Sequence, residues 1–189
     1  MEQIIPFERS YWVLPNKLLA GEIPSSHRRE QRKAKIDNLL SLGVNAIINL
    51  MEEEERNYNN DLITDYLPLL EERASLLNKT VELYRFSIRD LGIPSVQEME
   101  RILTKIDSLL SEGKTIYVHC WGGVGRTGVV VGCYLLRHGY ANASNVIDTI
   151  SYLKRTTNIA HRDSPETEEQ RNFVIQWETK YISAPRGKV

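Results

Sequence analysis

Cysteine is scarce in this 189-residue sequence, which contains only Cys120 and Cys133. Two cysteines cannot form the disulfide framework of a small secreted domain, so the sequence indicates a reducing compartment. Long apolar runs are also missing, since no stretch approaches the ~20 apolar residues of a membrane-spanning helix. Residues 1–6 lack a basic region followed by an apolar one, which an export signal requires. We therefore expect a cytoplasmic protein without a membrane span.

The sequence has neither a large net charge nor a spacing of residues typical of a metal site. The formal net charge is −1, which offers no general attraction to nucleic acid or an anionic membrane. The histidines at positions 27, 119, 138 and 161 show no metal-ligand spacing, so we expect no metal ion and no other cofactor. Any anion must then be recognised locally. Basic residues in the first half of a predicted helix over 28–42 suit either an anionic partner or a solvated helix face.

The most informative stretch is residues 118–128, which read VHCWGGVGRTG. Before it, Thr115–His119 predicts a short buried strand, and after it the apolar run Val129–Arg137 predicts a helix. The free amides and positive dipole end of a helix N-terminus stabilise an anion there. Glycines permit the positive φ values of an inward-facing amide nest. The loop Trp121, Gly122, Gly123, Val124, Gly125 and Arg126 is therefore a candidate phosphate-binding loop.

The same loop holds a candidate nucleophile. A thiol that ordinarily ionises near pH ~8.5 can ionise at roughly 3.5–7.5 when it lies at a helix N-terminus beside a cation. Cys120 lies at the predicted start of such a loop, and Arg126 offers a planar fork that can hold two phosphoryl oxygens at once. The alternative is a structural glycine loop with a buried, inert cysteine.

The pair His119-Cys120 together with Arg126-Thr127-Gly128 resembles the cysteine-dependent protein tyrosine phosphatases, and more closely their compact dual-specificity branch. The resemblance implies that Cys120 attacks phosphorus to form a phosphocysteine while Arg126 binds the phosphoryl oxygens. It also implies that Thr127 hydrogen-bonds the cysteine sulfur, although a threonine there equally suits a helix cap. His119 is expected to orient the loop through hydrogen bonds.

Two further site residues are implied by the resemblance. Asp90 follows the predicted strand Val81–Phe86 in a loop with Gly92 and Pro94, where the family carries its general acid. A turn aspartate is the alternative. Gln170 lies in a segment that resembles the one carrying a glutamine near the pocket, which positions the attacking water in classical members. An exposed helix residue is the alternative for Gln170.

The rest of the sequence alternates strands and helices, which predicts an α/β domain with a mainly parallel central sheet flanked by helices. The domain is expected to cover residues 1–182, followed by a loose tail at 183–189. The predicted elements are a hairpin at 11–21, strands at 46–50, 81–86 and 115–119, and helices at 28–42, 96–110, 129–137 and 146–153. A last helix is predicted to start at Ser164-Pro165 and to include Tyr181.

The segment between residues 51 and 80 is the least determined. It has helical character from Leu62 to Leu77, and its acidic run Glu52–Glu55 is expected to be exposed. The segment either forms a rim over the active site or packs only on the sheet edge.

We expect a phosphoric monoester hydrolase, a protein tyrosine or dual-specificity phosphatase that acts as a monomer on a phosphorylated protein or peptide. Relatives that act on phosphoinositides tend to place lysines in the loop, whereas this loop has Trp121, glycines and Val124. Phosphotyrosine is therefore favoured. The alternatives are a phosphoinositide or inositol phosphate phosphatase, an arsenate reductase and a non-catalytic phosphoprotein-binding module.

Overall fold

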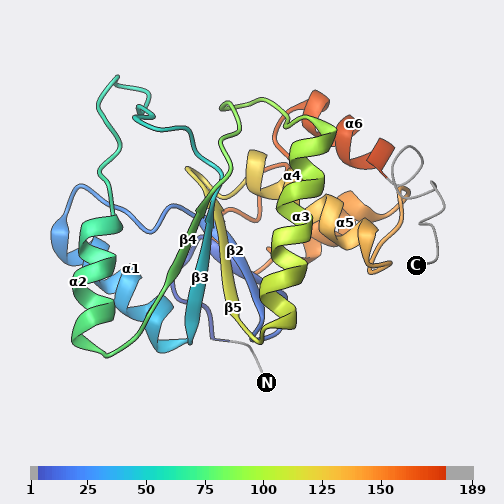
Figure 1. Cartoon of the computed structure of the whole chain (residues 1–189). Coiled ribbons are helices and arrows are strands. Elements are labelled where there is room, and N and C mark those ends of the chain that lie inside the picture. Colours follow the sequence, from blue (N-terminus) through green and yellow to red (C-terminus); the bar gives the residue numbers. More distant parts are fainter. Residues whose placement is uncertain (1–3, 178–189) are drawn as a thin grey trace.

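A five-stranded sheet runs through the middle of the protein in the computed structural model, which describes residues 4–177 (Figure 1). The strands lie in the order β1-β2-β5-β3-β4. Their bounds are β1 Ser10–Leu14, β2 Leu18–Glu22, β3 Val44–Asn49, β4 Glu82–Arg85 and β5 Thr115–Cys120. Only the β1–β2 pair is antiparallel, and the pairs β2–β5, β5–β3 and β3–β4 are parallel. The predicted mainly parallel α/β sheet is confirmed.

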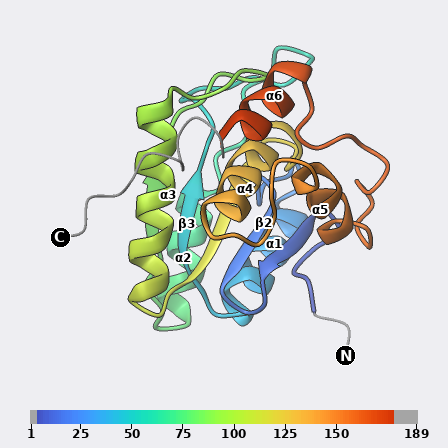
Figure 2. The ribbon, with the colours of Figure 1, turned by 90° about the vertical axis from the view of Figure 1, so that its right-hand side faces the viewer.

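Helices cover both faces of this sheet (Figures 1 and 2). Helices α1 (Arg29–Ser41) and α2 (Leu67–Leu76) lie on one face. The other face carries α3 (Val96–Ser111), α4 (Gly125–Arg137), α5 (Val146–Leu153) and α6 (Glu168–Trp177). Parallel strands need crossover connections, and these place the carboxyl ends of β2, β3, β4 and β5 at one edge of the sheet. The connecting loops at that edge form the functional face.

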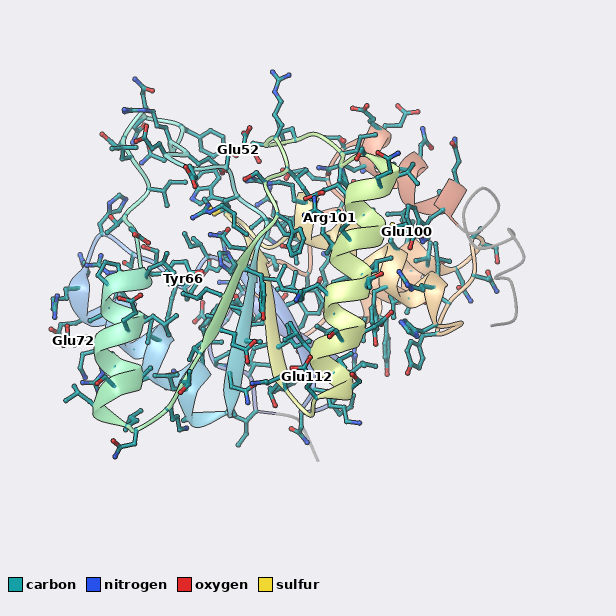
Figure 3. The ribbon with its side chains drawn as sticks, in the orientation of Figure 1. Glu52, Tyr66, Glu72, Glu100, Arg101 and Glu112 are labelled. Carbon is teal, nitrogen blue, oxygen red and sulfur yellow. The ribbon has the colours of Figure 1, made fainter. Side chains whose placement is uncertain are left out.

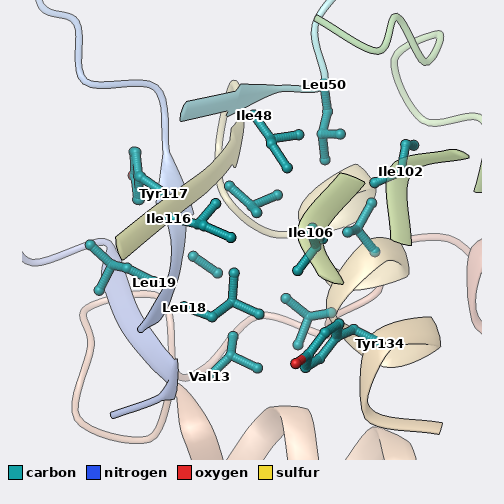
Figure 4. Close-up of a cluster of buried hydrophobic side chains, with 14 of the residues drawn as sticks. Val13, Leu18, Leu19, Ile48, Leu50, Ile102, Ile106, Ile116, Tyr117 and Tyr134 are labelled. Carbon is teal, nitrogen blue, oxygen red and sulfur yellow. The ribbon is translucent and has the colours of Figure 1, made fainter. Parts of the chain in front are cut away.

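The core between the sheet and the second helix layer explains the uninterrupted apolar sequence of β5 and α4. In Figure 4, Leu18, Ile48 and Ile116 project from the strands toward Ile106 of α3 and Tyr134 of α4. Each of these side chains is at most 3% exposed. Full burial of one such aliphatic side chain contributes about 1.5–3 kcal/mol, so this core holds α4 firmly behind β5.

Helix α3 begins at Val96 as predicted, and the Ser95 hydroxyl caps it by accepting a hydrogen bond from the Glu98 amide at 3.1 Å. Helix α4 begins at Gly125, four residues before the predicted start at Val129. Arg126 and Thr127 therefore belong to its first turn. Cys133 is fully buried within α4 and is a free cysteine, as a core position predicts.

The predicted start of the last helix at Ser164-Pro165 is wrong, because α6 begins at Glu168. The Ser164–Pro165 peptide is cis, and the Ser164 hydroxyl donates to the Val124 carbonyl at 2.8 Å instead of capping a helix. The cap is Thr167, whose hydroxyl accepts from the Gln170 amide at 3.2 Å while the Gln170 side chain accepts from the Thr167 amide at 3.1 Å. This is a reciprocal capping box.

The segment between β3 and β4 has two parts that lie in different places. Its second part forms α2, shorter than the predicted helical range, which packs beside α1 through a two-point ion pair of Arg73 with Asp37 at 2.7 and 3.2 Å. Its first part, residues 51–66, passes over the carboxyl edge of the sheet (Figure 1). The first half of the insertion thus lies over the carboxyl edge of the sheet, and the second half packs on α1.

The basic residues of α1 have partners inside the protein. Lys35 pairs with Glu22 at 2.6 Å, Arg29 with Glu72 at 3.0 Å, and Lys33 with Asp37 at 3.2 Å. These pairs favour an internally neutralised helix surface over a docking patch for an anionic partner. Within residues 4–177, no helix combines the length and apolar character that a membrane crossing requires. Tyr181 and the predicted tail at 183–189 lie outside the described residues.

Candidate active site

The loop that connects β5 to α4 lies at the carboxyl edge of the sheet and borders a cavity of about 490 Å³. Cys120, Gly122, Val124, Gly125 and Arg126 of the predicted loop all line this cavity. The cavity therefore opens at the point where parallel α/β sheets commonly bind their ligands.

Two features set the conformation of the loop. Gly123 has φ +71°, and a Cβ atom there would lie against Gly21 and 2.6 Å from the Glu22 amide nitrogen, so the loop packs directly on the β2 backbone. The Trp121 carbonyl accepts from the Ile23 amide at 3.1 Å. Since the C=O and N–H of a trans peptide point in opposite directions, the Gly122 amide points away from Ile23 and toward the cavity.

The same peptide geometry orients the Gly125 amide. The Val124 carbonyl accepts from the Ser164 hydroxyl at 2.8 Å and from the Gly128 amide at 3.1 Å. The Gly125 N–H therefore points the other way, at the first turn of α4, where it has no intrahelical acceptor. Gly122 and Gly125 both line the cavity, so their amides suit an oxyanion bound in front of Cys120.

Cys120 ends β5 and is 3% exposed, with its remaining surface in the cavity wall. The Thr127 hydroxyl lies 3.1 Å from the Cys120 sulfur and donates to it. Thr127 comes seven residues later and reaches back because the first turn of α4 folds over the loop. The sulfur thus lies close to both a helix N-terminus and a hydroxyl donor.

Arg126 is 1% exposed and is held by the Glu55 carboxylate and the Ile88 carbonyl. Both of its Nη atoms contact the Glu55 carboxylate, Nη1 at 2.6 Å and Nη2 at 2.7 Å. Nη1 also donates to the Ile88 carbonyl at 3.1 Å. Burial by itself would lower the pKa of Arg126, but the hydrogen bonds with Glu55 and the nearby Cys120 outweigh it and hold that pKa above its ordinary value. The guanidinium is therefore a fixed, permanent cation.

Asp90 lies on the loop that follows β4 and lines the same cavity. Its Oδ1 is 2.9 Å from Arg126 Nη2, and its side chain is 46% exposed. It stands at the second position of a turn in which the Gly92 amide donates to the Arg89 carbonyl at 3.0 Å. The structure thus brings the predicted nucleophile, cation and acid together in one cavity, although Asp90 is far from Cys120 in the sequence.

His119 lies one residue before Cys120, on the opposite side of β5 from the core of Figure 4, and is completely buried. Its Nε2 is 2.7 Å from the Tyr66 hydroxyl and its Nδ1 is 3.2 Å from the Cys120 carbonyl. A carbonyl can only accept, so Nδ1 carries the proton and Nε2 accepts from Tyr66. Figure 3 shows Tyr66 between α2 and the sheet. Burial lowers the pKa of His119 to about 3, so the ring stays neutral.

Trp121 packs edge-on against Tyr58, with ring centroids 4.6 Å apart. Both rings line the cavity, and Tyr58 comes from the insertion between β3 and β4. The two rings therefore form an aromatic wall beside the phosphate-binding loop. Trp121 faces the cavity rather than lying beneath the loop.

Gln170 is fully buried in the first turn of α6 and is not among the residues that line the cavity. The alternative of an exposed helix residue is wrong, because its side chain hydrogen-bonds both to its own helix start and to the Asp90 loop. The capping box described above is what turns this side chain inward.

Four residues at or behind the site were missed by sequence reasoning. Glu55 was expected to be exposed, but its side chain is 10% exposed and faces Arg126. Arg162 lies beside Gly122 and pairs with Glu166, and both line the cavity. Lys154 is buried and donates to the carbonyls of Ile159 at 2.9 Å and Ala160 at 3.1 Å, which fixes the segment that carries Arg162.

Little in the local sequence could have identified these residues. An acidic run looks the same whether it is solvated or folded over an arginine. Among residues 4–177, no three His, Cys, Asp or Glu side chains are grouped in a way that could hold a metal ion.

Comparisons with known proteins show the family and the fold. A sequence model of the family described as "Swiss Army Knife protein, DSP-PTPase phosphatase domain" matches residues 8–174. The protein tyrosine phosphatase domain-containing protein 1 of Mus musculus is 32% identical over 140 residues, which cover 71% of this chain and 18% of that protein. The phosphatidylglycerophosphate phosphatase PTPMT2 of Arabidopsis thaliana is 31% identical over 121 residues, which cover 64% of this chain and 45% of that protein. This chain thus spans less than half the length of both relatives.

Solved structures show the same fold. A kinase associated phosphatase in which serine replaces the catalytic cysteine superposes with a TM-score of 0.71 at 18% identity, over 97% of this chain and 99% of that one. Tk-PTP in its active form gives a TM-score of 0.65 at 22% identity, over 91% and 97% of the two chains. PTPMT1 in complex with PI(5)P gives a TM-score of 0.63 at 16% identity, over 90% of this chain and 94% of that one.

Proposed function

Since this chain belongs to the dual-specificity and tyrosine phosphatase-like family of cysteine phosphatases, we propose that it hydrolyses phosphoric monoesters through a phosphocysteine intermediate, with protein phosphotyrosine as its preferred substrate. The observation that carries this proposal is the arrangement of Cys120, Arg126 and Asp90 around one cavity. A nucleophile, a permanent cation and a carboxyl group in one site are what phosphoryl transfer requires.

The first step transfers the phosphoryl group to sulfur. The Cys120 thiolate attacks phosphorus, the bond from phosphorus to the ester oxygen breaks, and Asp90 gives its proton to the leaving oxygen. The amides of Gly122 and Gly125 hold the equatorial oxygens together with Arg126. These donors are in place beforehand, because Ile23 and Ser164 hold the loop carbonyls from behind.

The contacts of Arg126 indicate which edge of its guanidinium receives the substrate. Glu55 occupies the end formed by Nη1 and Nη2, whereas Asp90 contacts Nη2 at 2.9 Å. A phosphoryl dianion would replace Asp90 at the edge formed by Nε and Nη2, since planar bidentate binding needs two parallel N–H groups. The displaced Asp90 carboxyl group then lies beside the leaving oxygen.

The second step regenerates the enzyme. Asp90, now a carboxylate, takes a proton from a water molecule that attacks phosphorus, and the phosphorus–sulfur bond breaks to release inorganic phosphate. The hydrogen bond from Thr127 stabilises the departing Cys120 thiolate, for which the 3.1 Å distance to the sulfur is suitable. No cofactor takes part in this scheme.

Phosphotyrosine is supported by the wall of the cavity. The Tyr58 and Trp121 rings stand beside the loop, where they suit edge-on or stacked contact with a phenyl group. Such contacts contribute about 0.5–1.5 kcal/mol beyond buried area. A cavity of about 490 Å³ also leaves room for residues that flank a phosphotyrosine.

A second candidate is a phosphatidylglycerophosphate or phosphoinositide monoester, and it is favoured by the position of Arg162. Its side chain lies beside Gly122 of the loop and lines the cavity, as does Arg9, which pairs with Glu22 at 3.4 Å. These arginines place two guanidinium groups at the cavity, each paired with a glutamate, Glu166 or Glu22. The names of the similar proteins PTPMT2 and PTPMT1 in complex with PI(5)P point the same way.

The deciding experiment measures phosphate release from phosphotyrosyl peptides, phosphoseryl peptides, phosphatidylglycerophosphate and inositol phosphates. We expect the highest kcat/KM on phosphotyrosyl peptides and no turnover by Cys120→Ser, while Cys133→Ser, which changes the buried thiol, retains activity. A preference for the lipid or inositol substrates would move the assignment to the second candidate. Tight peptide binding without phosphate release by the wild-type protein would instead show a binding module.

Location and assembly belong to the same proposal. Cys120 and Cys133 are both free, which suits a reducing, cytoplasmic setting. We propose a monomer that acts on phosphorylated protein, and size-exclusion chromatography with light scattering checks this directly.

A further inference from the structure

We propose that Gln170 is a positioning residue that holds the Asp90 turn in the orientation needed for proton transfer. This inference rests on the proposed role of Asp90 as general acid. It differs from a role in orienting the attacking water, which is the role that family resemblance would suggest for this glutamine.

The hydrogen bonds of Gln170 carry the first part of the argument. Its Nε2 donates to the Gly92 carbonyl at 2.9 Å, and Gly92 closes the turn that carries Asp90. Its Oε1 accepts from the amides of Glu166 and Thr167, both at 3.1 Å. The oxygen that would accept from a water is therefore already shared by two backbone donors. The side chain is 0% exposed and does not line the cavity.

The Asp90 turn needs such an anchor because its backbone is strained. Leu91 has φ +60°, a left-handed conformation that is unfavourable for a residue with a side chain. Glycine would adopt it freely, but the glycine comes one position later, at Gly92. The turn therefore keeps its shape only when contacts outside it compensate for this cost.

Two such contacts hold the turn, one on each side. Before it, the Ile88 carbonyl accepts from Arg126 Nη1 at 3.1 Å, and after it, the Gly92 carbonyl accepts from Gln170. The first contact comes from the phosphate-binding arginine itself. The second is the contact whose donor can be removed without touching a group that meets the substrate.

Gln170 also contacts the phosphate-binding loop. A Cβ atom at Gly125 would lie 3.0 Å from Gln170 Oε1 and 3.2 Å from its Nε2, so the carboxamide packs directly against that glycine. One buried side chain thus touches the loop that binds the phosphoryl group and is bonded to the loop that carries the acid. It sets the separation between the two loops, on which proton transfer depends.

The test uses Gln170→Glu, Gln170→Met and Thr167→Ala. A glutamate keeps the acceptor for the capping box but, as a carboxylate, cannot donate to Gly92. A methionine removes the donor without adding charge. Thr167→Ala is the matched control, because it removes the hydroxyl that caps α6 and leaves the bond to Gly92 intact.

The readout is kcat/KM on a series of aryl phosphates, from 4-nitrophenyl phosphate, a good leaving group, to phenyl phosphate, a poor one. A general acid matters most when the leaving group is poor, and its loss costs about 10²–10⁴-fold. We expect both Gln170 variants to lose about 10-fold more activity on phenyl phosphate than on 4-nitrophenyl phosphate. For Thr167→Ala, kcat/KM should fall by the same factor on phenyl phosphate and on 4-nitrophenyl phosphate.

Asp90→Asn separates the two hypotheses. If Asp90→Asn shows no dependence on the leaving group, the proposed function of Asp90 fails, and the inference about Gln170 fails with it. If Asp90→Asn shows the dependence but both Gln170 variants slow every substrate equally, the positioning role alone is overturned. Circular dichroism confirms that the compared variants are folded, and Gln170→Met decides the question should the charge of the glutamate unfold the protein.

Discussion

Acid should destabilise this protein through His119, well above the pH at which carboxylates are protonated. The ring is completely buried between Tyr66 and the Cys120 carbonyl, and burial lowers its pKa to about 3. In the unfolded chain a histidine titrates near ~6.5. Below that pH the unfolded state binds a proton that the folded state rejects. The stability is therefore complete above pH ~6.5 and is lost as the pH falls from there toward about 3.

The magnitude follows from that difference in pKa. Each pH unit inside this window costs about 1.4 kcal/mol, so lowering the pH from 7.5 to 5.0 should remove about 2 kcal/mol from the free energy of unfolding. A typical domain has ~5–15 kcal/mol in total. Because His119 is adjacent to Cys120, we expect the loss to affect the phosphate-binding loop directly.

The assay is urea unfolding at pH 7.5 and 5.0 for the wild type, His119→Gln and His27→Gln. Glutamine at position 119 keeps an acceptor for Tyr66 but does not titrate. Between the two pH values, the free energy of unfolding of this variant should therefore fall by about 2 kcal/mol less than that of the wild type. His27 is exposed, and His27→Gln should behave like the wild type.

If the free energy of unfolding falls equally in the wild type and His119→Gln between pH 7.5 and 5.0, the role of His119 is refuted. If His119→Gln does not fold, the imidazole proton signals of His119 in the wild-type protein provide a second test. Those signals should stay at their neutral positions down to pH 5.0, and a titration above that pH would contradict the burial argument.

Two other predictions concern the loop and its cation. Glu55→Gln should destabilise the protein by about 2 kcal/mol, because Arg126 loses a buried charged partner. Millimolar vanadate should reduce the difference in stability between the wild type and Glu55→Gln, because it places an anion beside Arg126. Thermal unfolding with and without vanadate measures this difference, and a difference that vanadate leaves unchanged would contradict the prediction. Gly123→Ala should lower kcat/KM by about 100-fold, because the added Cβ atom would meet the β2 backbone. Gly113 also has a positive φ, +75°, but a Cβ atom there would meet no other atom, so Gly113→Ala should keep its activity and lower the free energy of unfolding by about 1 kcal/mol. Similar activities for the two alanine variants would show that the close approach to β2 is unimportant.

The loop between β5 and α4 could be predicted from the sequence because its residues are local. Cys120, the glycines, Arg126 and Thr127 are consecutive or nearly so, and a strand before them and an apolar helix after them constrain how the loop folds. The same holds for α3, whose cap and periodicity both lie within the helix. The mainly parallel sheet followed from the alternation of such local patterns.

Helix starts near the site were predicted less well. The sequence Ser164-Pro165 has the form of a helix start, but tertiary contact draws the Ser164 hydroxyl to Val124, and Thr167 caps α6 instead. Helix α4 starts at Gly125 because the loop and the first turn of the helix are one structure. Local preference identified that the helices exist, and long-range contacts decided where they begin.

Only the tertiary structure decided how the loop is completed. Glu55 lies 71 residues before Arg126, and its place in an acidic run carries no sign of the arginine that it meets. The bond from Gln170 to Gly92 joins residues 78 apart, and Arg162 reaches the loop from a segment that Lys154 holds in place. Side-chain type and spacing determine a contiguous loop, because its atoms meet within a few bonds. Partners from distant segments meet only because the sheet and its two helix layers bring their loops to one edge.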